Sequence, residues 1–302
     1  MSLDANPAAT RVGKPERIES IGLLVSLHKH PALPCARAVV DCLRRRGVQV
    51  RGNEELATHV QGIEVGDDAF VHSADVLLVV GGDGTILRAA RTAAPLGTPI
   101  LGVYVSGFGF LTEATSDGID RTLEDVLAGS YTIDERIMLT AHGERDPGRA
   151  VTALNDIVVR RERAPGMIDC YLWVSDTFVG EYRGDGLIAA TPTGSTCYSL
   201  AAYGPVVTPW LDAVVLAPMC VFTLNIRPLV IRADEEVRIE ARYKGDEPNG
   251  VTYSADGLPG IELKSGETLV VTKAPHKARF VRFEPGTFYT RLRQRLKWGA
   301  EI

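Results

Sequence analysis

The sequence predicts two domains: a doubly wound, Rossmann-like α/β domain followed by an antiparallel β-sandwich domain. Between residues 21 and 129 of the 302-residue chain, apolar strand-like runs alternate with helix-like segments, which is the pattern of an open α/β sheet. Beyond about residue 131 the pattern changes to short segments of period two, bounded by Gly and Pro, with few helical signals. The length also suits two domains better than one.

The first half supplies a strand or a helix in nearly every segment. The run "DVLLVV" at 75–80 is apolar on both faces, as a central parallel strand should be. Further strands are predicted at residues 21–27, 48–50 and 98–104. Helices are predicted at residues 35–47, 85–94 and 119–129, the first and last ending at Gly47 and Gly129.

In the second half, strands are predicted at residues 237–243, 268–274 and 278–284. The tail at 288–298 predicts a helix, because Leu292 and Leu296 recur at a spacing of four, and its basic residues are interpreted as a solvated face. We therefore expect a flexible lead-in at residues 1–18, the α/β domain at 19–131, the sandwich at 132–280, and a C-terminal strand and helix at 281–302 that pack back on the first domain.

Composition excludes several classes of function. A net charge of -5 argues against a nucleic-acid-binding surface. No apolar run reaches the roughly 18 residues of a membrane span, and the N-terminus lacks the apolar core of a signal peptide. The cysteines are odd in number and scattered without a C-x-x-C pair, which argues against a disulfide framework or a zinc site and favours the reducing cytoplasm.

The segment "LLVVGGDGT" places an acid in a glycine-rich turn between a strand and a helix. Gly81, Gly82 and Gly84 can adopt positive φ without penalty, so their successive N–H groups can turn inward as an anion nest, with the helix from Thr85 adding its positive end. Asp83 would then accept a proton from an attacking hydroxyl or help to hold a divalent cation. The alternative is a structural turn in which Asp83 caps the helix.

"GGDGT" resembles the motif of a kinase superfamily that includes NAD kinases, diacylglycerol and sphingosine kinases, and more distantly phosphofructokinases. The second half is similar to NAD kinases in particular, and the resemblance extends over nearly the whole chain. Four further segments carry it: "ALNDIVV" (153–159), "YRGDGLIAATPTGSTCYSLAAYGPVV" (182–207), "LAPMCVFTLNIRPLVI" (216–231) and "YSADG" (253–257).

The resemblance implies an α/β domain and a β-sandwich domain with NAD bound between them. It implies transfer of a phosphoryl group from ATP, or from inorganic polyphosphate, to the 2′-hydroxyl of the adenosine ribose, which gives NADP. Mg²⁺ or another divalent metal is implied by the phosphates and takes few protein ligands, so no protein metal site is expected. The family also implies a cytoplasmic homodimer or homotetramer that acts on small molecules, with no nucleic acid or membrane as partner.

In the first half, the resemblance makes Asp83 the catalytic aspartate, in contact with the reacting or the nicotinamide-side ribose. Phe110, in "FGFLTE", matches a phenylalanine that packs near the dinucleotide, with a plain core role as the alternative. The phosphate path would be lined by four residues: Gly81, Gly82, Gly84 and Thr85.

In the second half, Asn155 would meet the adenine or its ribose, Asp156 the 2′-hydroxyl, and Asp185 the adenine amine. Asp256 would bind on the nicotinamide side, and Arg183 would contact phosphate or only form a salt bridge. The adenine and ribose pocket would be walled by Thr193, Thr196, Cys197 and Tyr198. Simple turns at 155–156 and 256–257, and a plain capping loop at 191–196, are the alternatives.

The sequence departs from the family pattern at a few positions. Asp156 stands where a glutamate is usual and is one methylene shorter. Tyr104, Ser106 and Gly107 replace an asparagine, a glycine and an arginine, and the lost basic side chain is expected to weaken binding of a phosphate donor. Phe222 and Asn225 replace a histidine and a serine. The departures near Tyr104 and Asp156 keep open an NAD(P)-binding homologue with weak or no kinase activity, and the shared "GGDGT" motif and two-domain plan keep open a lipid-type kinase.

Overall fold

The computed structural model describes residues 9–10, 17–28, 31–105, 109–162, 166–223, 225–243, 250–284 and 287–297. The chain divides into two compact units, here called unit 1 (Met1–Glu135 with Lys277–Ile302) and unit 2 (Arg136–His276). The sequence placed the limits of the second domain at residues 132 and 280, close to these two division points. Which function each domain carries stays a prediction.

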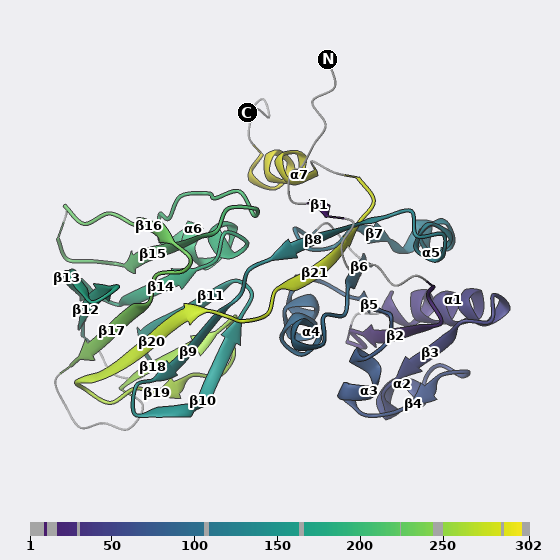
Figure 1. The fold of residues 1–302 in the computed structure, drawn as a ribbon, viewed down its shortest axis with the longest axis horizontal. Helices are drawn as coiled ribbons and strands as arrows, with labels where there is room; N and C mark the ends of the chain where they lie inside the picture. Colours follow the sequence, from purple (N-terminus) through teal and green to yellow (C-terminus); the bar gives the residue numbers. More distant parts are fainter. Residues whose placement is uncertain are drawn as a thin grey trace, which may run out of the picture. The chain divides into compact units, whose positions relative to one another are not determined.

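Unit 1 is built on a nine-stranded sheet, and its central pairs are parallel. In spatial order the strands are β1 (Ala9–Thr10), β8 (Thr132–Arg136), β21 (Ala278–Arg282), β6 (Ile100–Tyr104), β5 (Val76–Val80), β2 (Ser20–Val25), β3 (Gln49–Gly52) and β4 (Glu64–Val65), with β7 (Ala114–Thr115) paired to β6. Every residue of β5 is buried, as its apolar sequence predicts. The C-terminal strand β21 lies between β8 and β6 (Figure 1).

Helices cover both faces of this sheet, which confirms the doubly wound prediction. α1 (Ala32–Arg45) and α5 (Ile119–Leu127) share a core with one face of the sheet, to which Val76 and Leu78 contribute. α4 (Asp83–Leu96) lies against the other face, where a Cβ on Gly102 would meet Ile86 at 2.5 Å. The remaining helices are α2 (Glu54–Ala57), α3 (Asp68–His72), the 3₁₀ turn η1 (Ser116–Gly118) and α7 (Thr287–Leu296).

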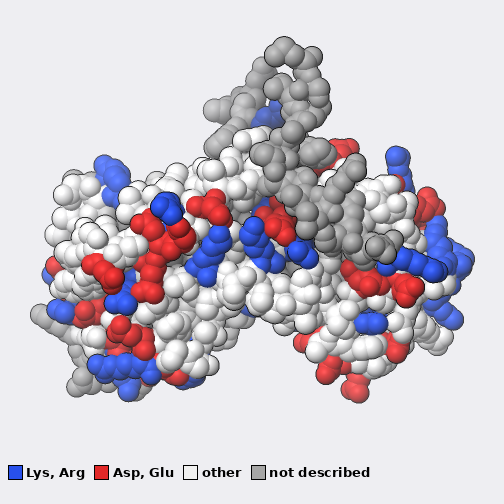
Figure 2. Space-filling view, in the orientation of Figure 1, with Lys and Arg blue, Asp and Glu red and all other residues white. Residues whose placement is uncertain are grey.

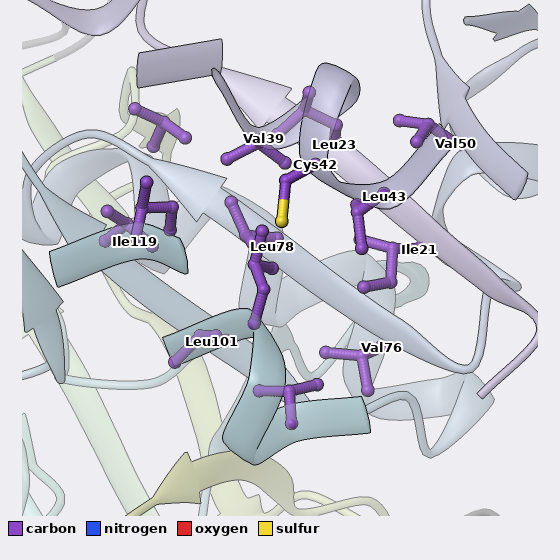
Figure 3. Packing of buried hydrophobic residues seen from close by; sticks show 14 of the residues in the cluster. Ile21, Leu23, Val39, Cys42, Leu43, Val50, Val76, Leu78, Leu101 and Ile119 are labelled. Atoms are coloured by element: carbon purple, nitrogen blue, oxygen red, sulfur yellow. The ribbon is translucent and has the colours of Figure 1, made fainter. Parts of the chain in front are cut away.

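Figure 3 shows the core beneath α1, where Val39 and Leu43 lie over Leu23 and Leu78 of the sheet. The Cys42 thiol lies among these apolar side chains, and burial is the main factor that raises the pKa of Cys42. Cys42 therefore contributes to this core as a small hydrophobe, and its Sγ also accepts a hydrogen bond from Arg46 Nη1 at 2.6 Å.

Unit 2 is an antiparallel β-sandwich, as predicted. One six-stranded sheet has the order β10 (Asp146–Ala153), β9 (Leu139–Gly143), β20 (Glu267–Lys273), β17 (Val237–Arg242), β12 (Ile168–Val174) and β13 (Thr177–Gly184). The other has the order β16 (Leu229–Arg232), β15 (Ala213–Met219), β14 (Gly186–Ala190), β11 (Asp156–Arg161), β18 (Val251–Ala255) and β19 (Ile261–Glu262). Residues of both sheets, such as Ile157 and Ile239, form one buried core. A short 3₁₀ turn η2 (Gly194–Thr196) and helix α6 (Tyr198–Ala201) follow β14.

On the face shown in Figure 2, Lys and Arg side chains are interspersed with Asp and Glu over both units. Within the described residues, no helix is both long and apolar enough to cross a membrane. All five cysteines are free thiols.

Candidate active site

The glycine-rich turn of unit 1 differs from its prediction in backbone conformation. α4 begins at Asp83, two residues earlier than expected, with the extended Gly82 (φ -110°, ψ -178°) as its N-cap. None of Gly81, Gly82 and Gly84 has positive φ, so the predicted nest built from left-handed glycines is wrong. Because the helix starts within the motif, the free N–H groups of its first turn are presented as a helix N-terminus instead.

Steric space explains one glycine of this turn, Gly81, but not Gly84. A Cβ on Gly81 would lie 2.8 Å from Oγ1 of Thr85, closer than a Cβ normally comes, and in a tight contact of 3.3 Å with Cβ of Ser26. A Cβ on Gly84 would meet nothing within 4 Å. Gly84 and Thr85 border a cavity of about 270 Å³ at the end of β2. Because Gly84 has no side chain, its backbone is left uncovered at this cavity.

The Asp83 carboxylate is held by the segment that follows β6. Its Oδ2 accepts a hydrogen bond from the Phe110 N–H at 3.0 Å, and its Oδ1 accepts one from the Leu111 N–H at 3.2 Å. A carboxylate has about four acceptor positions, so others remain for a ligand. The hydrogen bonds given for the Asp83 side chain go to this segment, and the N-cap of α4 is Gly82. Phe110 belongs to the same cluster, and the Arg295 guanidinium lies 5.7 Å from its ring centre.

Arg88 is a basic residue of this region that the sequence analysis missed. It lies one turn beyond Gly84 and Thr85 on α4 and lines the same cavity. The available signal was spacing, since residues three and four apart share a helix face. A second cavity of about 190 Å³ is also lined by Arg88 and extends to His72. His72 is buried, neither ring nitrogen has a hydrogen-bond partner among the described residues, and burial lowers the pKa of His72.

In unit 2, Asp256 gathers three backbone donors. It has a left-handed conformation (φ 49°), and its carboxylate accepts from the N–H groups of Leu154, Asn155 and Asp156 at 2.9, 2.7 and 3.3 Å. The Asp256 N–H in turn donates to the Asp156 carbonyl at 3.0 Å. Asp256 therefore fixes the start of β11, where two predicted site residues lie.

Those two residues, Asn155 and Asp156, are buried. Asp156 is 5% exposed. Burial, with a smaller contribution from the charge of Asp256, raises the pKa of Asp156 to about 7. Asn155 is 8% exposed, and its Oδ1 has no hydrogen-bond partner among the described residues. An unpartnered buried acceptor is costly, and a bound donor group would satisfy it.

The "TPTGST" loop packs directly on this segment. The Thr191 N–H donates to the Asn155 carbonyl at 2.8 Å, and the Gly194 N–H donates to Thr191 Oγ1 at 3.1 Å. A Cβ on Gly194 would lie 2.1 Å from the Asn155 carbonyl oxygen, so only glycine fits. Thr193, which is 8% exposed, accepts a hydrogen bond from Arg136 at 3.3 Å. The structure thus brings Asn155 and Thr193 together with the Asp156–Asp256 pair.

Arg183, Asp185 and Tyr198 lie at another part of unit 2. Arg183 forms an exposed ion pair with Asp169 at 3.6 Å, which is the salt-bridge alternative. A hydrogen bond with the exposed Asp185 is the main cause that raises the pKa of the Cys220 thiol. Cys220 and Tyr198 line a pocket of about 510 Å³ whose floor is largely apolar.

Thr196 and Cys197 join these two parts of unit 2 along the chain. Thr196 donates to the Thr193 carbonyl at 3.3 Å, and the Cys197 thiol is exposed. Of the departures noted in the sequence, Tyr104 ends β6, whereas Ser106 and Gly107 lie outside the described residues. Phe222 is 75% exposed.

Both halves of the sequence match known protein families. Residues 21–131 match the family model of the ATP-NAD kinase N-terminal domain, and residues 154–283 match that of the ATP-NAD kinase C-terminal domain. The chain is 39% identical over 286 residues to the NAD kinase of Moorella thermoacetica, which covers 94% of this chain and 91% of the relative. It is 36% identical over 289 residues to the NAD kinase of Geobacter sp. strain M21, and the matched region covers 93% of this chain and 99% of that relative.

Solved structures show the same fold. A yeast NADH kinase crystallised with NADH superposes with a TM-score of 0.87 at 21% identity, covering 95% of this chain and 90% of that one. An NAD kinase from Archaeoglobus fulgidus in complex with ATP gives a TM-score of 0.71 at 25% identity, covering 92% and 98%.

Proposed function

The chain belongs to the NAD kinase family, and from that premise we propose how its residues divide the work. It is an NAD kinase, which transfers a phosphoryl group from ATP to the 2′-hydroxyl of the adenosine ribose of NAD and releases NADP. The observation that carries this conclusion is the 39% identity to an NAD kinase over 94% of the chain.

The direct test is to incubate the purified chain with NAD, ATP and Mg²⁺ and to measure NADP with an NADP-specific dehydrogenase. NADP formation in proportion to enzyme is expected. No NADP despite tight NAD binding would identify a binding homologue, and turnover of diacylglycerol or a long-chain diol would identify a lipid kinase. Running the assay with ATP or polyphosphate, and with NAD or NADH, defines the donor and the acceptor.

We assign the chemical step to Asp83. A ribose hydroxyl is a poor nucleophile and needs a base within hydrogen-bond reach, a contribution of about 10²–10⁴-fold. Two backbone N–H groups orient the Asp83 carboxylate and leave acceptor positions free. Phosphoryl transfer otherwise depends on positioning and on neutralisation of charge, so the turn residues Gly81, Gly82, Gly84 and Thr85 are proposed to line the phosphate path.

We assign recognition of the dinucleotide to unit 2. The unpartnered Oδ1 of Asn155 supports a role as acceptor for an adenine or ribose donor group. The buried Asp156 is proposed to face the 2′-hydroxyl, and Thr193, Thr196, Cys197 and Tyr198 to wall the adenosine pocket. Asp185 is proposed to accept from the adenine amine, and Arg183 to contact phosphate when not paired with Asp169. Asp256 is proposed to serve the nicotinamide side and to hold the Asn155–Asp156 backbone.

For the donor, we propose that ATP places its phosphates at Gly84 and Thr85, with Arg88 as the neighbouring cation. This arginine would offset the loss of the basic side chain replaced by Gly107. The described residues contain no group of three or more His, Cys, Asp or Glu side chains able to hold a metal ion. Mg²⁺ is therefore proposed to be held mainly by the donor phosphates, which suits an ion that keeps few protein ligands, and to offset their charge.

Homo-oligomer formation and a cytoplasmic location are also proposed. Tyr203 is 91% exposed and lines the 510 Å³ pocket of unit 2, as does Val221, the chain neighbour of the 75% exposed Phe222. Large exposed apolar side chains favour a protein partner. Light scattering during size-exclusion chromatography should show a dimer or tetramer. Five free cysteines fit a reducing compartment.

A further inference from the structure

Arg282 and Arg291 donate hydrogen bonds to the backbone segment that binds the Asp83 carboxylate. We propose that Arg291 of α7, acting with Arg282 and Glu113, is a positioning residue for the catalytic carboxylate of Asp83. The inference rests on the assignment of Asp83 as the base.

The two residues that donate to Asp83 are held from their other side. Phe110 donates its N–H to Asp83, and its carbonyl accepts a hydrogen bond from Arg291 Nη1 at 3.0 Å. Leu111 donates its N–H to the same carboxylate, and its carbonyl accepts from Arg282 Nη1 at 3.0 Å. Each donor residue is therefore fixed at its N–H by the acid and at its carbonyl by an arginine.

Glu113 locks both arginines into this arrangement. Its Oε2 accepts from Arg282 Nη1 at 2.9 Å and from Arg291 Nη2 at 2.5 Å, and its Oε1 accepts from the Phe283 N–H at 3.1 Å. The three side chains are 4–8% exposed. Buried charges with several hydrogen bonds each define their geometry sharply. Arg291 also spans both groups, since one of its nitrogens binds the Phe110 carbonyl and the other binds Glu113.

Phe110 therefore connects Arg291 of α7 to the carboxylate of Asp83. Loss of Arg291 frees the Phe110 carbonyl and leaves Glu113 with one arginine, so the Phe110–Leu111 backbone and the Asp83 carboxylate it binds can move. A displacement of about 1 Å at a catalytic group can cost about 10²-fold in rate. The effect should fall on turnover, because the proposed NAD-recognising residues other than Phe110 lie in unit 2 or on the phosphate path.

The experiment compares Arg291→Ala with Arg293→Ala, an exposed arginine of the same helix. For each variant we would measure kcat for NADP formation, the dissociation constant of NAD by calorimetry, and the thermal unfolding midpoint. Arg291→Ala is expected to lower kcat at least tenfold while the NAD dissociation constant stays within twofold, and Arg293→Ala to behave as the parent. Arg291→Lys, which keeps a cation for Glu113 but not the forked pair of bonds, should recover part of the loss and serves if the alanine variant does not fold.

A second comparison separates positioning from stability. If Arg291 acts through Asp83, then adding Arg291→Ala to Asp83→Asn removes little further activity, because the group being positioned is already gone. An additional tenfold loss in the Asp83→Asn background would show a general structural role and overturn the proposal, as would unchanged kcat in a folded Arg291→Ala protein. Full activity of Asp83→Asn would instead refute the assignment of the base, and absence of NADP with the parent would refute the proposed function.

Discussion

The Asp83 carboxylate occupies the space that a side chain on Gly109 would need. A Cβ on Gly109 would lie 2.3 Å from Oδ1 of Asp83 and 2.9 Å from Oγ1 of Thr112. The two residues are far apart in the chain, and they meet where the end of β5 adjoins the segment after β6. This glycine therefore determines how closely the Phe110 and Leu111 N–H groups can approach the acid.

Gly109→Ala should lower kcat by about 10²-fold, the cost of displacing a catalytic group by roughly 1 Å, and leave the fold intact. Steady-state kinetics of NADP formation, with circular dichroism of the variant, measure both effects. Gly118→Ala is the matched control in unit 1, because its Cβ would have only an ordinary contact at 3.9 Å. Equal kcat values for the two variants would contradict the prediction.

Gly84→Ala should separate stability from activity. The position is in the first turn of α4 and a Cβ there meets no atom within 4 Å, so alanine should stabilise the protein by about 0.4–1 kcal/mol. The same methyl group would project toward the proposed phosphate path, so turnover should fall at least tenfold. Urea unfolding and the coupled assay measure the two effects, and a stabilised variant with full turnover would remove Gly84 from the phosphate path.

Arg88→Ala should weaken the binding of the donor ATP without changing the binding of NAD. Removing the cation that lines the cavity at Gly84 and Thr85 should raise the KM for ATP by about tenfold or more, since a charge-assisted hydrogen bond contributes roughly 1.5–3 kcal/mol. The NAD dissociation constant should not change. Arg121→Ala, an exposed arginine on α5, is the control. A KM for ATP that stays at the parent value in Arg88→Ala would place the donor elsewhere.

Asp156→Asn should change the pH dependence of stability. The pKa of Asp156 is raised to about 7 in the folded state, so the folded protein binds this proton more tightly than the unfolded chain does. The free energy of unfolding contributed by Asp156 therefore falls as the pH rises from about 4 to about 7 and is level above that. Asn resembles the protonated acid and removes this slope.

The variant should consequently gain about 2–3 kcal/mol relative to the parent between pH 5 and pH 8, at about 1.4 kcal/mol for each pH unit below 7. Urea unfolding at the two pH values gives the difference directly. Curves for parent and variant that run parallel between pH 5 and pH 8 would show that Asp156 is ionised normally.

Gly194→Ala should abolish the binding of NAD. Its Cβ would lie 2.1 Å from the Asn155 carbonyl oxygen, so the "TPTGST" loop must move away from the Asn155–Asp156 backbone. We expect the NAD dissociation constant to rise at least a hundredfold, measured by calorimetry. Gly143→Ala in β9, where a Cβ meets no atom within 4 Å, is the control in the same unit; NAD binding that survives in Gly194→Ala would show that this loop is not part of the site.

Local pattern predicted the elements because their cause is local. The apolar run of β5 and the spacing of buried Val39, Val40 and Leu43 on α1 required no distant information. The start of α4 was placed two residues late because glycine is a poor helix former, yet Gly84 is within the first turn. The prediction of positive φ at these glycines was wrong for a related reason, because a helix that begins at Asp83 requires negative, right-handed φ at Gly84.

Site residues could be proposed from the sequence only where a motif is contiguous. Asp83 and the Asn155–Asp156 pair were proposed from short stretches and stay predictions, whereas the residues that hold them come from other parts of the chain. Gly109 and Arg291 support Asp83 from other elements, and Asp256 binds the backbone of residues 154–156 through a fold that brings β18 beside β11. No spacing in one sequence encodes these contacts. Their determinants are the packing and the register of the sheets.

The insertion of β21 between β8 and β6 has a consequence for synthesis of the protein. The strand that fills this gap, and the arginines that bind the Phe110 and Leu111 carbonyls, are translated only after the whole of unit 2. A nascent chain that has completed only its first 276 residues therefore has an unfilled place in its first sheet and an acid without its full support. A chain truncated before residue 277 lacks both this strand and these arginines, and is expected not to phosphorylate the dinucleotide.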